Sequence, residues 1–279
     1  MMRTRNFNKM TNDEVEAYLA RRDIIFIPVG VVETHGGLPL DCETILAEAV
    51  ALKMAEKADG LYLTNLPYFF AGCTTVGRGT IQMSVSGGVR YLKALALSLL
   101  RQGFRRQIYL TNHGVAFLTV GTVIREVFEE TGAPLLYIEN GKLKDRAPGE
   151  DTRQSGTDLF CGAYQLMGCL EDVPLNVPEG HSISYEPIKL GLDFATEMMH
   201  MGPPSGTLGH LITVPAEHVP TAVLRSEKER LESAARGVRM IEKMVEKSDI
   251  ANVVETLKRA DDHMQTIIPN YPWLQMYGK

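Results

Sequence analysis

The chain has 279 residues, of which 44% are hydrophobic and 23% are charged, a composition typical of a globular protein. A chain of this length buries about three quarters of its unfolded surface, so its core needs no support from disulfides or metal ions. The net charge of −5 comes from 34 acidic and 29 basic residues mixed along the chain, which argues against nucleic-acid and acidic-membrane partners.

The cysteines and the N-terminal segment indicate the cellular compartment in which the protein is expected. The four cysteines are irregularly spaced and form no CxxC pair, so we expect reduced thiols and a cytoplasmic protein. The N-terminal segment has no apolar core of a signal peptide, and no apolar run approaches the roughly 20 residues of a membrane span. The sequence therefore predicts a protein that is neither exported nor inserted in a membrane.

In the first half of the chain, short apolar runs alternate with segments of helical periodicity. The expected strands are residues 24–29, 61–66, 107–111 and 135–139. The expected helices are residues 44–58, 88–102 and 117–131. This alternation predicts βαβ units, and hence an α/β fold with three layers, α/β/α, around a mainly parallel central sheet.

The second half of the chain has a looser pattern. Residues 142–156 are charged and contain Gly and Pro, which predicts a surface loop, and residues 174–187 are irregular and rich in proline. Helices are expected at 193–200 and at 226–248, the latter amphipathic and packed on the sheet. With no linker and no internal repeat, we expect one domain over residues 1–279.

Candidate metal ligands follow two of the expected strands. Glu33 and His35 come after the first strand and His113 after the third, and ligands of parallel sheets bind at the carboxyl ends of strands. Taken singly, Glu33 could be a solvated loop residue, His35 a local cap and His113 a satisfied core histidine. Together they favour a site for a divalent transition metal, since carboxylate and imidazole are suitable ligands.

These residues also carry a family resemblance. The segment at 28–44 reads PVGVVETHGGLPLDCET and resembles the signature of the creatininase (creatinine amidohydrolase) family, with Pro-Val-Gly, Glu-x-His-Gly, Leu-Pro-Leu and an acidic residue before Thr in that order. GRGTIQMS at 77–84 is similar to a later Gly-Thr-Ile segment, and Asn112, His113 and Gly114 to part of the family's Asn-Gly-His-Gly-Gly-Asn. The resemblance extends from about residue 23 to residue 246 and is strongest in the first 115 residues.

The resemblance implies two divalent metal ions per chain, zinc, manganese or iron. It implies that Glu33 and His113 bind one ion, that His35 binds the other, and that an acidic residue lies between them. Alignment on Leu-Pro-Leu and Thr44 assigns this bridge to Glu43, where the family has Asp, and Asp41 is the alternative.

The resemblance also implies a late glutamate ligand. Two candidates stay open, because Glu197 falls in an expected helix while Glu186 keeps the family's spacing from a histidine, here His181. His181, with Glu186, is the candidate for proton transfer, and an exposed loop histidine is the alternative.

The expected function is hydrolysis by a metal-activated water. The first hypothesis is a dinuclear metal-dependent hydrolase that opens or cleaves a small polar, cyclic substrate at an amide or formamide C–N bond. One alternative is ring-opening C–C hydrolysis of an inositol-derived diketone, and another is a metal- or sugar-binding protein without catalysis. The family resemblance implies a small-molecule substrate and a homo-oligomer. The assembly that the resemblance suggests is a hexamer.

Overall fold

The computed structural model describes residues 2–72, 78–145, 149–177 and 221–271. Four parallel strands form its sheet in the order β2-β1-β3-β4. They are β1 (Ile24–Pro28), β2 (Leu61–Tyr62), β3 (Arg106–Thr111) and β4 (Leu136–Glu139). The expected mainly parallel sheet is confirmed, whereas the single domain over 1–279 stays a prediction.

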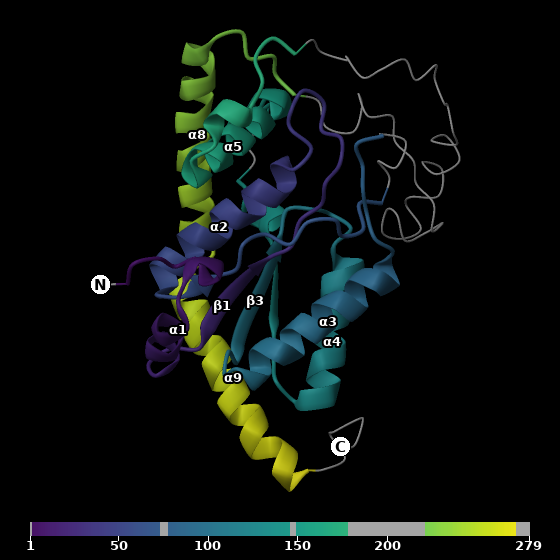
Figure 1. Ribbon diagram of the computed structural model, residues 1–279, viewed down its shortest axis with the longest axis vertical. Coiled ribbons are helices and arrows are strands. Elements are labelled where there is room, and N and C mark those ends of the chain that lie inside the picture. Colours follow the sequence, from purple (N-terminus) through teal and green to yellow (C-terminus); the bar gives the residue numbers. More distant parts are fainter. Residues whose placement is uncertain (1, 73–77, 146–148, 178–220, 272–279) are drawn as a thin grey trace.

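Helices cover both faces of this sheet (Figure 1). One core lies between the sheet and α2 (Cys42–Ala58), α5 (Thr152–Met167), α8 (Glu227–Lys247) and α9 (Ile250–Asn270). The other core lies between the sheet and α1 (Asn12–Leu19), α3 (Val85–Arg101) and α4 (Phe117–Thr131). Short 3-10 turns occur at η1 (Phe7–Lys9), η2 (Asn140–Leu143) and η3 (Leu170–Asp172). The three-layer α/β/α prediction is therefore confirmed.

The second strand is shorter than the sequence predicts. It was expected over 61–66, but β2 ends at Tyr62, and Leu66 forms only an isolated bridge to Val29. Between these points polar side chains take the backbone donors, since the amide of Thr64 donates to Asn8 and that of Asn65 donates to Glu48. The parallel ladder is interrupted because the Asn65 amide is no longer available to β1, and the amide of Leu66 donates to Pro28.

The expected loop at 142–156 is wrong over its last part. Helix α5 begins at Thr152, where the Asp151 side chain accepts hydrogen bonds from the backbone amides of Arg153 and Gln154. An aspartate N-cap stabilises a helix start by satisfying amides that have no partner inside the helix. Helix α9 was also not expected, and the expected helix at 193–200 lies outside the described residues.

Helix α8 was expected to pack on the sheet, but it packs chiefly on α5. A Cβ added at Gly237 of α8 would lie 1.8 Å from the backbone oxygen of Asp158, and one at Gly162 of α5 would lie 2.3 Å from the backbone of Gly237. The two helix backbones therefore touch, which only glycine permits. Beside this crossing, Arg236 donates two hydrogen bonds to the buried Asp158. No helix in the described residues combines the length and apolar composition needed to cross a bilayer.

We predict that Gly237→Ala destabilises the protein by about 1–3 kcal/mol, because the added methyl group overpacks the α5–α8 crossing. The matched control is Gly156→Ala in α5, where an added Cβ has no neighbour within 4 Å. That change should stabilise the protein by about 0.4–1 kcal/mol, because alanine lowers the conformational entropy of the unfolded chain. Urea unfolding of both variants measures the difference, and equal midpoints would contradict the packing argument.

Candidate metal centre

The loop after β1 is held against the start of α2. A Cβ at Gly30 would lie 2.6 Å from the Cα of Thr44, so only glycine allows this close approach. The Thr44 hydroxyl donates to the backbone oxygen of Val31 at 2.7 Å, and both residues are buried. The first turn of α2, which carries Glu43, is thereby fixed to the loop that carries Glu33 and His35.

Backbone hydrogen bonds close the same loop on itself. The amide of Glu33 donates to the oxygen of Leu40, and the amide of Leu38 donates to the oxygen of His35, both at 3.0 Å. Gly36 between them has a φ of 55°, a left-handed conformation that suits glycine. The Gly37 amide donates to the Thr221 hydroxyl at 3.1 Å, so the loop is also tied to the segment before α8.

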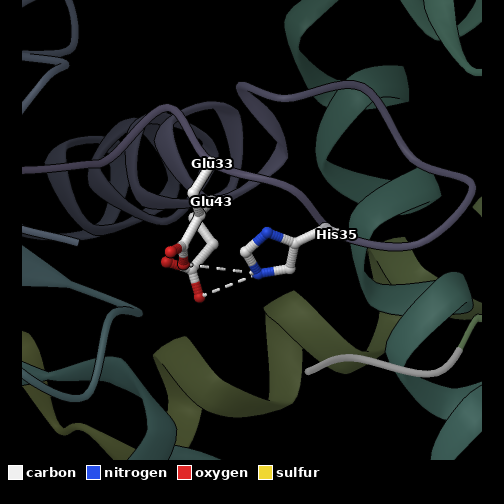
Figure 2. Close-up of side chains that lie close together, drawn as sticks. All are labelled: Glu33, His35 and Glu43. Atoms are coloured by element: carbon white, nitrogen blue, oxygen red, sulfur yellow. Dashed lines mark ion pairs between the residues drawn. The ribbon is translucent and has the colours of Figure 1, made fainter. Parts of the chain in front are cut away.

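Glu33, His35 and Glu43 point toward one another from this loop and from α2 (Figure 2). His35 Nε2 lies 3.8 Å from Glu33 Oε1 and 3.5 Å from Glu43 Oε1. One potential ligand atom from each of the three residues lies within 4.8 Å of the other two. These distances are short enough for the three side chains to share metal ions.

His113, which follows β3, completes the group from the neighbouring strand. Its Nδ1 lies 2.7 Å from Glu43 Oε2 and 3.2 Å from Glu33 Oε1. Its other nitrogen, Nε2, donates to the backbone oxygen of Ala71 at 3.1 Å. The two oxygens of Glu43 therefore face one histidine each, Oε1 toward His35 and Oε2 toward His113.

The four side chains are withdrawn from solvent. Glu33 is 0% exposed, His35 1% and His113 5%, and the Glu43 side chain is 12% exposed. Burial alone would lower the pKa of His113, but the Glu43 carboxylate and the hydrogen bonds to Glu33 and Glu43 prevail and raise it to about 10. Burial is likewise outweighed at His35, where contacts with Cys42 and Glu43 raise the pKa well above its usual value. Burial would raise the pKa of Glu43, yet the His113 charge holds it well below its usual range.

This arrangement fits a divalent transition metal. Two imidazoles and two carboxylates supply the nitrogen and oxygen ligands that zinc and manganese accept. The hydrogen bond from His113 Nε2 to Ala71 leaves Nδ1 as the nitrogen that faces the carboxylates and that a metal ion would bind after displacing its proton, as expected for a histidine ligand held by a second hydrogen bond. Which residue binds which ion, as the resemblance implies, stays a prediction.

Asp41, the alternative bridge, lies outside this group of ligand atoms. The Tyr164 hydroxyl donates a hydrogen bond to its carboxylate, and Asp41 occupies the N-cap position of α2. Glu43, two residues later, is the second residue of α2 and faces both histidines. Glu43, and not Asp41, is therefore the acidic residue of this turn that contacts both histidines, and its place between two ions stays a prediction.

Helix α5 was not expected near the site, although two of its side chains contact the loop between β1 and α2. The Phe160 ring meets the His35 ring edge to face, with centroids 5.8 Å apart, and Tyr164 holds Asp41. The helical spacing of the apolar residues at 159, 160, 163 and 164 is the signal that could have found this helix. The other expected site residues, His181, Glu186 and Glu197, lie outside the described residues.

Comparisons with known proteins match this fold and this loop. The family model described as creatinine amidohydrolase (creatininase) matches residues 8–164, more than half of the chain. A curated relative from Thermotoga maritima, named 3-dehydro-scyllo-inosose hydrolase, is 33% identical over 118 residues. That match covers 40% of this chain and only 37% of the relative.

Solved structures share the fold. One described as creatinine amidohydrolase (creatininase) is 18% identical, with a TM-score of 0.61 over 93% of this chain and 98% of that one. A creatininase described as the Mn form is 16% identical, with a TM-score of 0.60 over 93% of this chain and 99% of that one. A mutant creatininase of the Zn-Zn type gives the same values. At these identities the likeness establishes the fold alone.

We predict that Glu43→Gln loses at least one metal ion per chain, because the amide cannot supply two anionic oxygens to two ions. Asp41→Asn is the matched control and should keep the full metal content, since its partner is Tyr164. Elemental analysis of both proteins after metal loading and desalting measures this. Loss of metal from Asp41→Asn with retention by Glu43→Gln would reverse the assignment.

We predict that metal binding releases protons and strengthens with pH. With a pKa of about 10, His113 is protonated at pH 7 in the metal-free protein, and a metal ion must displace that proton. Below pH 10 the apparent affinity should rise about tenfold per pH unit for each displaced proton. Calorimetric titration with Zn²⁺ in buffers of different ionisation enthalpy measures the release. An affinity independent of pH between 6 and 8 would contradict the prediction.

Proposed function

The chain belongs to the creatininase family of metal-dependent hydrolases, and from this premise we propose that it hydrolyses a bond next to a carbonyl group in a small polar, cyclic substrate. Two divalent ions held by Glu33, His35, Glu43 and His113 are part of this proposal. The observation that carries it is the position of Glu43, whose two carboxylate oxygens face one histidine each.

Divalent ions held by Glu33, His35, Glu43 and His113 would supply Lewis acidity, which lowers the pKa of a water molecule and polarises a substrate carbonyl. The chain's own residues set the conditions for this chemistry. Glu33 and His35 are buried, so charges at the site act in surroundings of low dielectric constant, where electrostatic interactions are strong. The Ala71 oxygen fixes the His113 ring, so its Nδ1 stays directed at the carboxylates without reorganisation.

A proton must also move from the attacking water to the leaving group. His181 and Glu186 are the residues that we propose for this step, and Glu197 or Glu186 for a late ligand, on the resemblance of the sequence to the family. A histidine suits the step because its pKa lies near neutral pH, where it both accepts and donates a proton.

The first proposed substrate class is a cyclic amide or formamide, cleaved at its C–N bond. It rests on family membership, since the matching family model is described as creatinine amidohydrolase. Amide hydrolysis develops negative charge on the carbonyl oxygen, and divalent cations held at this site would stabilise that charge.

The second candidate is ring-opening C–C hydrolysis of an inositol-derived diketone. A specific observation favours it, because the curated relative with 33% identity is named 3-dehydro-scyllo-inosose hydrolase. Water attack on one of two neighbouring carbonyls needs the same stabilisation of negative oxygen as amide cleavage. The two candidates therefore share one site and differ in the substrate.

We predict that the metal-loaded protein turns over a member of one of these two classes. The experiment is a hydrolysis screen of the Zn²⁺- and Mn²⁺-loaded protein across cyclic amides, formamides and 3-dehydro-scyllo-inosose. Chelation should abolish turnover, and His113→Ala should lower it at least about 100-fold, because outer-shell changes alone cost about 10–100-fold.

His263→Ala is the control, since His263 is an exposed residue of α9, and it should leave turnover unchanged. Turnover that survives His113→Ala would contradict the proposed site. Full metal retention with no turnover of any class would favour the alternative of a metal- or sugar-binding protein.

A further inference from the structure

Two asparagines lie side by side at the edge of the sheet where the metal ligands gather. Asn112 directly follows β3 and Asn140 directly follows β4. The last pair of the β3–β4 register joins Thr111 to Glu139, so the next residue on each strand is one of these asparagines. Asn112 also directly precedes the candidate ligand His113.

Both side-chain amides are buried and have no hydrogen-bond partner within the described part of the chain. This holds for the oxygen and for the nitrogen of each amide, and Asn140 is 0% exposed. An unpaired buried polar group costs about 1–3 kcal/mol, and native proteins retain few of them. Two adjacent residues of this kind call for a further hydrogen-bond partner, which the described part of the chain does not supply.

Both asparagines stand just past the ends of their strands, Asn112 in a bend and Asn140 at the start of η2. Asn112 precedes His113, whose Nδ1 lies 2.7 Å from Glu43 Oε2. Leu110 and Ile138, two residues earlier on the same strands, pack in the core beneath α2, the helix that carries Glu43. The two asparagines therefore lie at the carboxyl edge of the sheet, next to the metal centre.

We propose that Asn112 and Asn140 bind the substrate through its uncharged hydrogen-bonding groups and select a ring that carries hydroxyl or amide groups. A primary amide offers two donors and one acceptor without net charge. A hydroxyl or an amide has both donor and acceptor capacity and can satisfy such a pair, whereas an anionic group would leave the amide oxygens unpaired. This assignment rests on the proposed function and narrows its substrate class.

The test measures binding without turnover. Myo-inositol and scyllo-inositol, which have no carbonyl group to hydrolyse, serve as uncharged cyclic probes and are titrated calorimetrically into the Zn²⁺-loaded protein. The proposal predicts that at least one probe binds and that Asn140→Leu and Asn112→Leu each weaken it about tenfold or more, the size of one hydrogen bond. Metal content should not change, and the Tm should stay or rise, because leucine replaces an unpaired amide at similar volume.

Tyr137→Phe is the matched control. Its hydroxyl is also buried without a hydrogen-bond partner in the described residues, but Tyr137 packs in the core on the opposite face of the sheet. Its removal should leave probe binding and metal content unchanged.

Two results would overturn the proposal. The first is that neither probe binds to the wild type. The second is that both leucine variants bind the probes as the wild type does, and a lowered Tm in that case would assign the amides a structural role. Failure of the proposed function is a separate outcome, since a protein with asparagine-dependent probe binding but no hydrolysis would refute catalysis and keep the binding assignment.

Discussion

The burial of two carboxylates and two imidazoles in one place is the constraint on which this structure depends. Removing charged groups from water is expensive unless each charge is compensated inside the protein. Without metal, the compensation is protonation of the histidines, which is why the pKa of His113 rises to about 10 while that of Glu43 falls. Divalent cations would provide the same compensation with the histidines neutral, so proton and metal compete for one site.

The fold supplies this site through contacts that tolerate little change. Glycine at position 30 lets α2 approach the loop after β1, and the Thr44 hydroxyl fixes the two together. Glu43 then lies in the first turn of α2, where the helix dipole favours a negative charge. The glycine crossing of α5 and α8 is a second close contact, and α5 also carries Phe160, whose ring lies against that of His35.

Much of this arrangement could be predicted from the sequence, and the exceptions have physical reasons. The helix at 117–131 was predictable because its apolar periodicity is strong, and the first, third and fourth strands were predictable because each is a short apolar run. Helix α5 was missed because its start lies in a polar segment, where the signal is a single capping aspartate. The short β2 could not be predicted, since a side chain distant in sequence, that of Glu48, takes the Asn65 amide that would continue the pairing with β1.

The candidate site was also predictable only in part from the sequence. Glu33, His35 and His113 were predictable because strand ends converge at one edge of a parallel sheet. The choice between Asp41 and Glu43 needed the structure, since it depends on the Tyr164 hydroxyl that binds Asp41. The buried amides of Asn112 and Asn140 could not be recognised from sequence either, because burial without a partner is a property of the folded chain.

The most direct test of the two-ion centre is anomalous diffraction from crystals of the protein loaded with Zn²⁺ or Mn²⁺. The account predicts two anomalous peaks about 3.5–4 Å apart, with Glu43 between them and His35 and His113 on opposite sides. No peak within ligand distance of Glu43, or a single ion bound elsewhere on the chain, would contradict it.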